Sequence, residues 1–271
     1  MRTISGAVVE SFASSSPGQF LLLHGNPGSR ETFAKLAPLL TGLGEVAALD
    51  LPGFGESADP PGGAKVSVES HAQTVIAVAE DLGWKSPVLV GHSHGGGVAL
   101  VAAALAPERF SGVVLVASLG FPAHFAYRLL NVPLAHAVMS AAGHALRLPG
   151  ARLLLELNMR RVFAPERVDP SRAAHELAFF TRRPATLRHM VDLARGAPSE
   201  LLHRLAPEVR CPALVIHGVE DALVPLACAR AIHERLPKSQ FIAVERAGHM
   251  LPEQQPELLA RQIANWRRGA P

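Results

Sequence analysis

A serine between two glycines, where an apolar run meets a run of small residues, constrains this chain more than any other feature. Residues 91–95 read Gly-His-Ser-His-Gly and lie between the apolar residues 87–90 and the small residues 96–105. A serine at such a tight turn from strand to helix has a strained backbone, and the residues two positions away on either side must be small. The pattern therefore predicts that Ser93 projects from the edge of a β-sheet, where its hydroxyl can act as a nucleophile.

The composition is that of a folded, globular chain. Its 271 residues are enough for one large domain, or for one domain with an insertion. Hydrophobic residues make up 48% and charged residues 18%, a balance that excludes a disordered chain. The net charge is only +3, and the arginines are scattered rather than grouped with aromatic residues. We therefore expect no nucleic-acid partner.

The sequence contains no evident targeting or membrane segment. No apolar run approaches the roughly 18 residues that span a bilayer, and residues 1–12 lack the basic and long apolar regions of a secretory signal. Cys211 heads a predicted strand and Cys228 lies in a predicted helix, which favours two reduced structural thiols over a disulfide. We therefore expect a cytoplasmic protein with no membrane partner.

Strand-like and helix-like segments alternate along most of the chain. Short apolar strands that alternate with helices indicate a parallel sheet covered on both faces, so we predict an α/β fold with a mostly parallel central sheet. The predicted strands are residues 4–12, 20–24, 46–51, 87–90, 113–117, 213–217 and 241–244, and the predicted helices are residues 30–40, 68–82, 96–105, 226–236 and 256–268.

The alternation stops between residues 120 and 205. This stretch contains no convincing strand, and prolines separate four helix-like segments, residues 135–148, 151–162, 171–181 and 186–194. We predict a helical lid at 120–205, inserted into a core domain formed by 1–119 and 206–271. The lid carries twelve arginines and six acidic residues. We interpret these arginines as solvated helix faces, and attraction of an anionic substrate is the alternative.

Two loops after predicted strands supply the partners that a serine nucleophile needs, a base and an acid that orients it. Asp221 and His249 each follow a strand, on the edge of the sheet where sites of α/β proteins form. The order Ser93, Asp221, His249 is the order expected for this arrangement. Glu220 is an alternative acid, but the spacing from Gly218 favours Asp221.

The loop at residues 24–28 reads His-Gly-Asn-Pro-Gly and follows another predicted strand. We expect the backbone N–H of Asn26 to join that of His94 in an oxyanion hole. His92 and His94 flank the serine and suggest a metal site. The turn sends their side chains apart, however, and no third ligand has a recognisable spacing, so we predict no metal.

Five ordered motifs make the chain resemble the α/β-hydrolase family, in particular its lidded Ser-His-Asp members, which include esterases, carbon–carbon hydrolases and cofactor-free haloperoxidases. The motifs are the loops at 24–28 and 50–57, the turn at 91–95, the segment 218–225 and the pair 248–249. The resemblance covers nearly the whole chain outside the lid. It implies that no cofactor is needed and that the 50–57 loop shapes a turn beside the site.

Two departures from related families narrow the expected activity. Haloalkane dehalogenases and epoxide hydrolases resemble this chain in the 24–27 loop but have aspartate as the nucleophile, where Ser93 stands here. Proline iminopeptidases usually have tryptophan directly after the serine, where this chain has His94. We therefore expect none of these three activities.

The sequence thus predicts a serine hydrolase that cleaves an ester, or a similar acyl bond, of a small and mostly apolar substrate through an acyl-enzyme at Ser93. A carbon–carbon bond hydrolase with the same triad is an alternative, as is a ligand receptor on a hydrolase scaffold. Candidate substrate-binding residues are Phe121, Phe125 and Met250. No oligomeric state is predicted.

Overall fold

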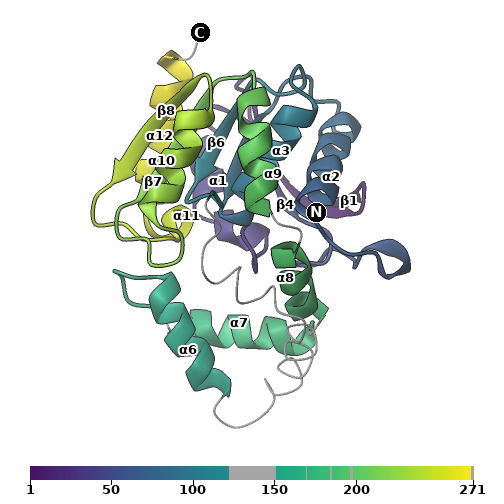
Figure 1. Cartoon of the computed structure of the whole chain (residues 1–271). Helices are drawn as coiled ribbons and strands as arrows, with labels where there is room; N and C mark the ends of the chain where they lie inside the picture. The colour runs from purple at the N-terminus through teal and green to yellow at the C-terminus, as the bar shows by residue number, and fades with distance from the viewer. Residues whose placement is uncertain (122–150, 169, 184, 196–197, 270–271) are drawn as a thin grey trace.

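A single sheet of eight strands, in the order β1-β2-β4-β3-β5-β6-β7-β8, forms the centre of the computed structural model, which describes residues 1–121, 151–168, 170–183, 185–195 and 198–269 (Figure 1). The strands from β4 to β8 in this order are parallel, and the β1–β2 hairpin joins β4 in antiparallel fashion. The strands are β1 Arg2–Ile4, β2 Ala7–Phe12, β3 Gly18–Leu23, β4 Gly44–Asp50, β5 Val88–His92, β6 Gly112–Val116, β7 Ala213–Gly218 and β8 Ser239–Val244.

Helices cover both faces of this sheet, which confirms the predicted α/β fold class. Alternate residues of a strand point to opposite faces, and in β3 Leu21 and Leu23 pack in one core cluster while Phe20 and Leu22 pack in the other. The first cluster includes residues of α2 Val68–Asp81, α3 His94–Leu105 and α10 Leu226–Arg235. The second includes residues of α1 Leu36–Leu40, α11 Leu251–Gln254 and α12 Pro256–Gly269. Both faces of the parallel strands are therefore dry, as their apolar runs require.

Two predicted elements are interrupted in the structure. The expected strand at 4–12 is a hairpin, because the chain turns at Ser5 and Gly6, both with positive φ. The expected helix at 30–40 is split into the 3-10 helix η1 Arg30–Phe33 and α1. Pro38 has no N–H to donate to a preceding turn, so it fits the first turn of a new helix better than the middle of a long one.

Between β6 and β7 the described part of the chain is helical. It forms α6 Ala151–Val162, α7 Pro170–Arg182, α8 Ala185–Arg195 and α9 Pro198–Leu205. The first three match the predicted helices, α9 was not predicted, and the helix expected at 135–148 lies outside the described residues. Leu201 and Leu202 bring α9 into the core beside α3. In Figure 1, α6 and α7 lie beyond the sheet, facing its carboxyl edge.

Short 3-10 turns complete the described elements, η2 Pro61–Gly63 and η3 Ala206–Glu208. Within the described ranges, no helix combines the length and the apolar character needed to cross a membrane.

Candidate active site

Ser93 lies at the turn between β5 and α3 in a conformation that few side chains adopt. Its φ is 52° and its ψ is −115°, outside the ordinary regions for a residue with a Cβ. The flanking glycines make this turn possible: a Cβ added at Gly91 would lie 2.1 Å from the carbonyl oxygen of Gly95, and one added at Gly95 would lie 2.0 Å from that of Leu23. The helix is thus pressed against the sheet, and the buried Ser93 sits at the carboxyl edge.

The loop after β3 packs directly against this turn. A Cβ added at Gly25 would lie 3.1 Å from both the Cβ of Ser93 and Nδ1 of His92, so a side chain here would force its neighbours to shift. Asn26 lies in the same loop, and His94 is the first residue of α3. The first N–H groups of a helix have no partner within the helix. The two expected oxyanion donors therefore stand on elements that meet at Ser93.

His249 and Asp221 are joined by a short hydrogen bond, from His249 Nδ1 to Asp221 Oδ2 at 2.7 Å. The other oxygen, Oδ1, accepts the backbone N–H groups of Leu223 and Val224, each at 2.8 Å. Burial alone would raise the pKa of Asp221, but hydrogen bonds from His217 and His249 outweigh it and lower that pKa below its usual range. Asp221 is therefore a fixed anion, and His249 carries its proton on Nδ1.

The rival acid Glu220 is exposed. Its backbone N–H donates to the carbonyl oxygen of Ala247. The structure thus brings His249 to Asp221 and leaves the Glu220 side chain outside the pair.

A second histidine, which the sequence did not indicate as a site residue, lies beside the same carboxylate. His217 ends up fully buried near the end of β7, and its Nε2 donates to the carbonyl oxygen of Val224 at 2.8 Å. The same nitrogen is 3.3 Å from Asp221 Oδ2. Its position four residues before Asp221, at the end of a strand, was the only signal in the sequence. His217 and His249 therefore both approach the same oxygen, Oδ2, of Asp221.

His92 fixes the backbone of the candidate base. Its Nε2 donates to the carbonyl oxygen of His249 at 2.9 Å, and the two rings lie 4.9 Å apart. Burial, with the neighbouring His249, lowers the pKa of His92 to about 3, so this ring is neutral. Its Nδ1 is buried without a hydrogen-bond partner among the described residues.

His94 points away from Ser93 into a chain of buried histidines. The carbonyl oxygen of Pro52 can only accept, so His71 donates to it from Nε2 at 3.1 Å. His71 Nδ1 must then accept the N–H of His94 Nε2, at 3.0 Å. Burial lowers the pKa of both rings. Among the described residues, no group of three or more His, Cys, Asp or Glu side chains is placed to hold a metal ion.

Ser93 and His249 line one cavity of about 110 Å³. Its walls come from the 25–28 loop, from α6 and α7, and from the residues around the serine and the two histidines. Met250 belongs to these walls, but Phe121 instead packs in the core, with its ring 4.9 Å from that of His203. Phe125 lies outside the described residues. The aromatic residues Phe163 and Phe180 of the predicted lid also line the cavity, whereas the sequence did not indicate these further wall residues: Asn158, Met159, Val162, Arg172 and Leu223.

A model of the alpha/beta hydrolase fold matches residues 19–256, which is most of the chain. The chain belongs to the α/β-hydrolase family. The hydrolase YugF of Bacillus subtilis (strain 168) is 30% identical to it over 273 residues, covering 97% of this chain and 96% of YugF. The 2-hydroxymuconate semialdehyde hydrolase of Pseudomonas putida is 27% identical over 238 residues, covering 82% of this chain and 76% of that protein.

Solved structures agree with this assignment. A thermophilic esterase from Thermogutta terrifontis is 26% identical, with a TM-score of 0.76 over 97% of this chain and 93% of the esterase. The protein is therefore an enzyme of the hydrolase class, with relatives that are named as hydrolases and esterases.

In this α/β-hydrolase, the 50–57 loop is a buried anchor beside the site. The backbone N–H of Arg30 donates to Asp50 Oδ1 at 2.6 Å, and the Arg30 guanidinium donates to Oδ2. The N–H of Glu56 also reaches Oδ2, at 2.8 Å. Gly55 has a φ of +53°, and a Cβ there would collide with the Asp50 carboxylate. The loop therefore folds around one buried ion pair, in keeping with the turn-shaping role that the resemblance implied.

Proposed function

We propose that this enzyme is a serine hydrolase that cleaves an ester, or a similar acyl bond, of a small and mostly apolar substrate. The observation that carries the proposal is the hydrogen bond of 2.7 Å between Asp221 and His249, beside a strained Ser93 that lines the same cavity as His249. A serine nucleophile needs a base, and the base needs an acid that fixes its tautomer. This chain offers all three residues at one edge of the sheet.

In the proposed mechanism, His249 carries its proton on Nδ1, so its Nε2 is free to accept the proton of the Ser93 hydroxyl. The Ser93 oxygen attacks the substrate carbonyl carbon, and the π electrons of the C=O bond move to its oxygen, which becomes an oxyanion. When the intermediate collapses, the leaving alcohol takes the proton from His249 and an acyl-enzyme remains. Water then repeats these steps, which releases the acid and restores Ser93. Asp221 stays ionised throughout, consistent with its lowered pKa.

The oxyanion hole is proposed to consist of the backbone N–H groups of Asn26 and His94. Removing one such donor typically costs about 3 kcal/mol of barrier lowering. Support comes from the packing of the 24–28 loop against the turn, with Gly25 in contact with Ser93. The N-terminus of α3 adds a favourable field for the developing negative charge.

We assign the role of a lid to α6 and α7. The cavity has mostly apolar walls. They come from Met159 and Val162 of α6, from Phe163 directly after it, from Phe180 of α7 and from Met250 of the core. Such walls favour an apolar acyl or alcohol group over a strongly hydrated one. A covered site also limits the access of water to the acyl-enzyme.

A carbon–carbon bond hydrolase is the second candidate, and the similarity to a semialdehyde hydrolase favours it. The same three residues would then act on a vinylogous diketone. For the compartment, we infer the cytoplasm, because Cys211 and Cys228 are both buried free thiols.

The proposal is tested with p-nitrophenyl esters of short fatty acids. We expect turnover by the wild type and loss of turnover in Ser93→Ala. Ser111→Ala serves as the matched control, because Ser111 precedes the amino end of β6, whereas Ser93 lies at the carboxyl edge of the sheet. Labelling of Ser93 by a fluorophosphonate without turnover of any ester would favour a ligand receptor. Turnover of a dienoic diketone in preference to all esters would favour the second candidate. Absence of labelling would remove Ser93 as the nucleophile.

A further inference from the structure

The cavity at Ser93 is too small to hold a whole substrate of ordinary size. Its volume is about 110 Å³, whereas sites for small molecules usually measure about 300 to 1,000 Å³. A second hollow of about 380 Å³ lies next to it, and Gly28 and Arg172 belong to the walls of both. A substrate larger than the cavity at Ser93 would have to extend past these two residues into the larger space, which we call the outer hollow.

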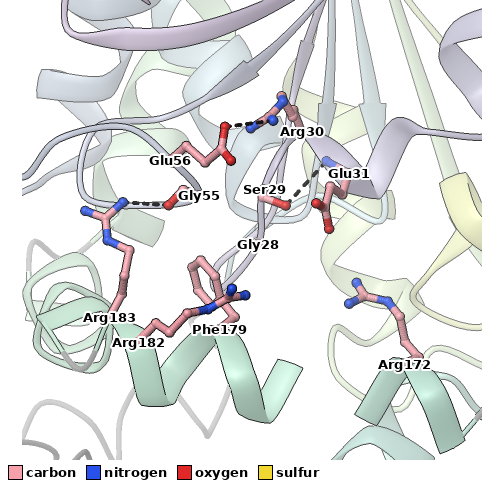
Figure 2. Close-up of a pocket in the computed structure, with 10 residues that line it drawn as sticks. All are labelled: Gly28, Ser29, Arg30, Glu31, Gly55, Glu56, Arg172, Phe179, Arg182 and Arg183. Atoms are coloured by element: carbon pink, nitrogen blue, oxygen red, sulfur yellow. Dashed lines mark hydrogen bonds and ion pairs between the residues drawn. The ribbon is translucent and has the colours of Figure 1, made fainter. Parts of the chain in front are cut away.

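Four arginines line the outer hollow, namely Arg30, Arg172, Arg182 and Arg183 (Figure 2). The other charged wall residues are Glu31 and Glu56, and the remaining wall residues are Gly28, Ser29, Gly55 and Phe179. The wall thus has two more positive than negative side chains.

Three of these arginines are held by acidic partners. Arg30 is bound to Asp50 and to Glu56, the latter at 2.9 Å. Arg172 donates from Nε and Nη2 to both carboxylate oxygens of Glu253, at 3.2 and 3.1 Å.

Arg183 is held at the other end of the hollow. It donates to the carbonyl oxygens of Gly55 and Ser57 and to Asp59, the last at 3.0 Å. These three arginines therefore shape the walls, and their charge is largely compensated.

Arg182 is different. Its side chain is exposed, and within the described residues its hydrogen bond is to the carbonyl oxygen of Ala178 in its own helix, from Nε at 3.2 Å. No acidic partner is recorded for it in the described part of the chain. The two terminal nitrogens of its guanidinium are therefore available to a ligand. Phe179 lies three residues earlier, on the same face of α7, and Figure 2 draws both side chains on the α7 side of the hollow, with Glu31 on the opposite wall.

We propose that the outer hollow binds a terminal carboxylate of the substrate through Arg182, with the adjoining apolar chain against Phe179. This inference rests on the proposed function and adds a substrate class to it: esters or related acyl compounds with a carboxylate at the end remote from the cleaved bond. A planar guanidinium matches one carboxylate in a bidentate pair. A guanidinium also pairs with a phosphate in this geometry, so a phosphate-ended ester is included in the test.

Matched p-nitrophenyl esters test the proposal. One series consists of mono-p-nitrophenyl esters of dicarboxylic acids, and the other of p-nitrophenyl esters of fatty acids with the same chain length. The two members of a pair therefore differ only at the far end of the acyl chain. The quantity measured is the KM of the carboxylate ester divided by the KM of its neutral partner. We expect Arg182→Gln to raise this ratio about three- to five-fold, as for a partly exposed ion pair.

Three further variants test whether the charge of Arg182 is responsible for the preference. Arg182→Lys should restore most of the preference, because it keeps the charge. Glu31→Gln should lower the ratio, because it removes a negative charge from the opposite wall. Arg188→Gln, an exposed α8 arginine that lines neither hollow, is the matched control and should leave the ratio as in the wild type. The effect of Arg182 should shrink in concentrated salt.

The inference fails if Arg182→Gln and the wild type give the same ratio while the neutral esters are cleaved in a Ser93-dependent manner. A larger effect on a phosphate-ended ester would overturn the carboxylate assignment. If no ester is cleaved, the proposed function fails, and a binding measurement then tests separately whether the outer hollow binds a carboxylate. Calorimetric titration of Ser93→Ala with monomethyl adipate should then give a Kd that Arg182→Gln raises about three- to five-fold, and equal Kd values would refute the site.

Discussion

Lowering the pH to about 5 should destabilise this protein by several kcal/mol. The reason is that four histidines are buried in the neutral form around the turn at residues 91–95, which we call the elbow turn. His24, His71, His92 and His94 are each at most 2% exposed. Burial lowers the pKa of His71 and of His92 to about 3, with a contribution from His249 at His92, and it also lowers the pKa of His24 and His94. The folded protein therefore excludes protons that the unfolded chain accepts.

The sign and size follow from this difference. A histidine in the unfolded chain has a pKa near 6.5. Between that pH and about 3, the unfolded state binds one more proton at each of His71 and His92, so stability falls as the pH falls, by about 1.4 kcal/mol per unit for each residue. From about pH 7.5 to pH 5 the pair loses about 4 kcal/mol, against a usual total stability of about 5–15 kcal/mol. Carboxylates remain mostly ionised over this range.

The hydrogen bonds explain why the native state resists protonation. His71 donates from Nε2 to Pro52 and accepts from His94 at Nδ1. A proton added at Nδ1 of His71 would face the N–H on Nε2 of His94. The other ring nitrogen of His94, Nδ1, is buried without a hydrogen-bond partner among the described residues, so no acceptor stands ready for that proton there. The chain of bonds can hold only neutral rings.

Urea unfolding at about pH 7.5 and pH 5 measures the effect, with the m-value as a check on two-state behaviour. His71→Gln should reduce the pH dependence by the share of one histidine, whereas His203→Gln, at an exposed side chain, should keep the dependence of the wild type. A loss of less than about 1 kcal/mol between the two pH values, or an unchanged slope in His71→Gln, would refute the reasoning.

Three other predictions follow from the site. Asp221→Asn should lower kcat on esters by about 10⁴-fold with little change in KM, because an amide no longer holds the catalytic tautomer of the base; steady-state kinetics measures it, and a loss below ten-fold would contradict the role. Gly95→Ala should abolish folding, since its Cβ would lie 2.0 Å from a carbonyl oxygen of β3; circular dichroism with a native spectrum would contradict this. Arg30→Met should cost about 3–5 kcal/mol in urea unfolding, because it leaves the buried Asp50 unpaired, and a cost near zero would contradict the anchor.

The parallel sheet and its turns could be predicted because their physical requirements are local. Strands buried on both faces must be continuously apolar, as in β5 and β7, and the elbow turn needs small residues at Gly91 and Gly95. The first hairpin was missed because its turn at Ser5 and Gly6 interrupts an otherwise strand-like run. The helix α9 was missed because it is only eight residues long, although Pro198 at its start and the buried Leu201 and Leu202 are typical of an amphipathic helix.

For the site, the sequence order predicted which loops would meet, but not the side chains that support them. Placing Asp221 and His249 in loops after parallel strands was enough to bring them together. His217 reaches the same carboxylate only because the following loop folds back and offers the carbonyl oxygen of Val224. Arg172 lies between the two hollows because α7 packs over the core, where this arginine forms an ion pair with Glu253. Contacts of this kind depend on the tertiary structure and cannot be read from the spacing of residues along the sequence.

The division of labour between the sheet and α6–α7 has a consequence for how this enzyme can change. The residues proposed for chemistry all follow β3, β5, β7 and β8, in turns too crowded for substitution, whereas much of the cavity wall comes from helices that add no strand to the sheet. Asn158, Met159, Val162, Phe163 and Phe180 can therefore vary without disturbing the strands of the sheet or the groups that react. Selection, in nature or in a combinatorial library at these five positions, can explore new substrates while the reaction itself stays constant.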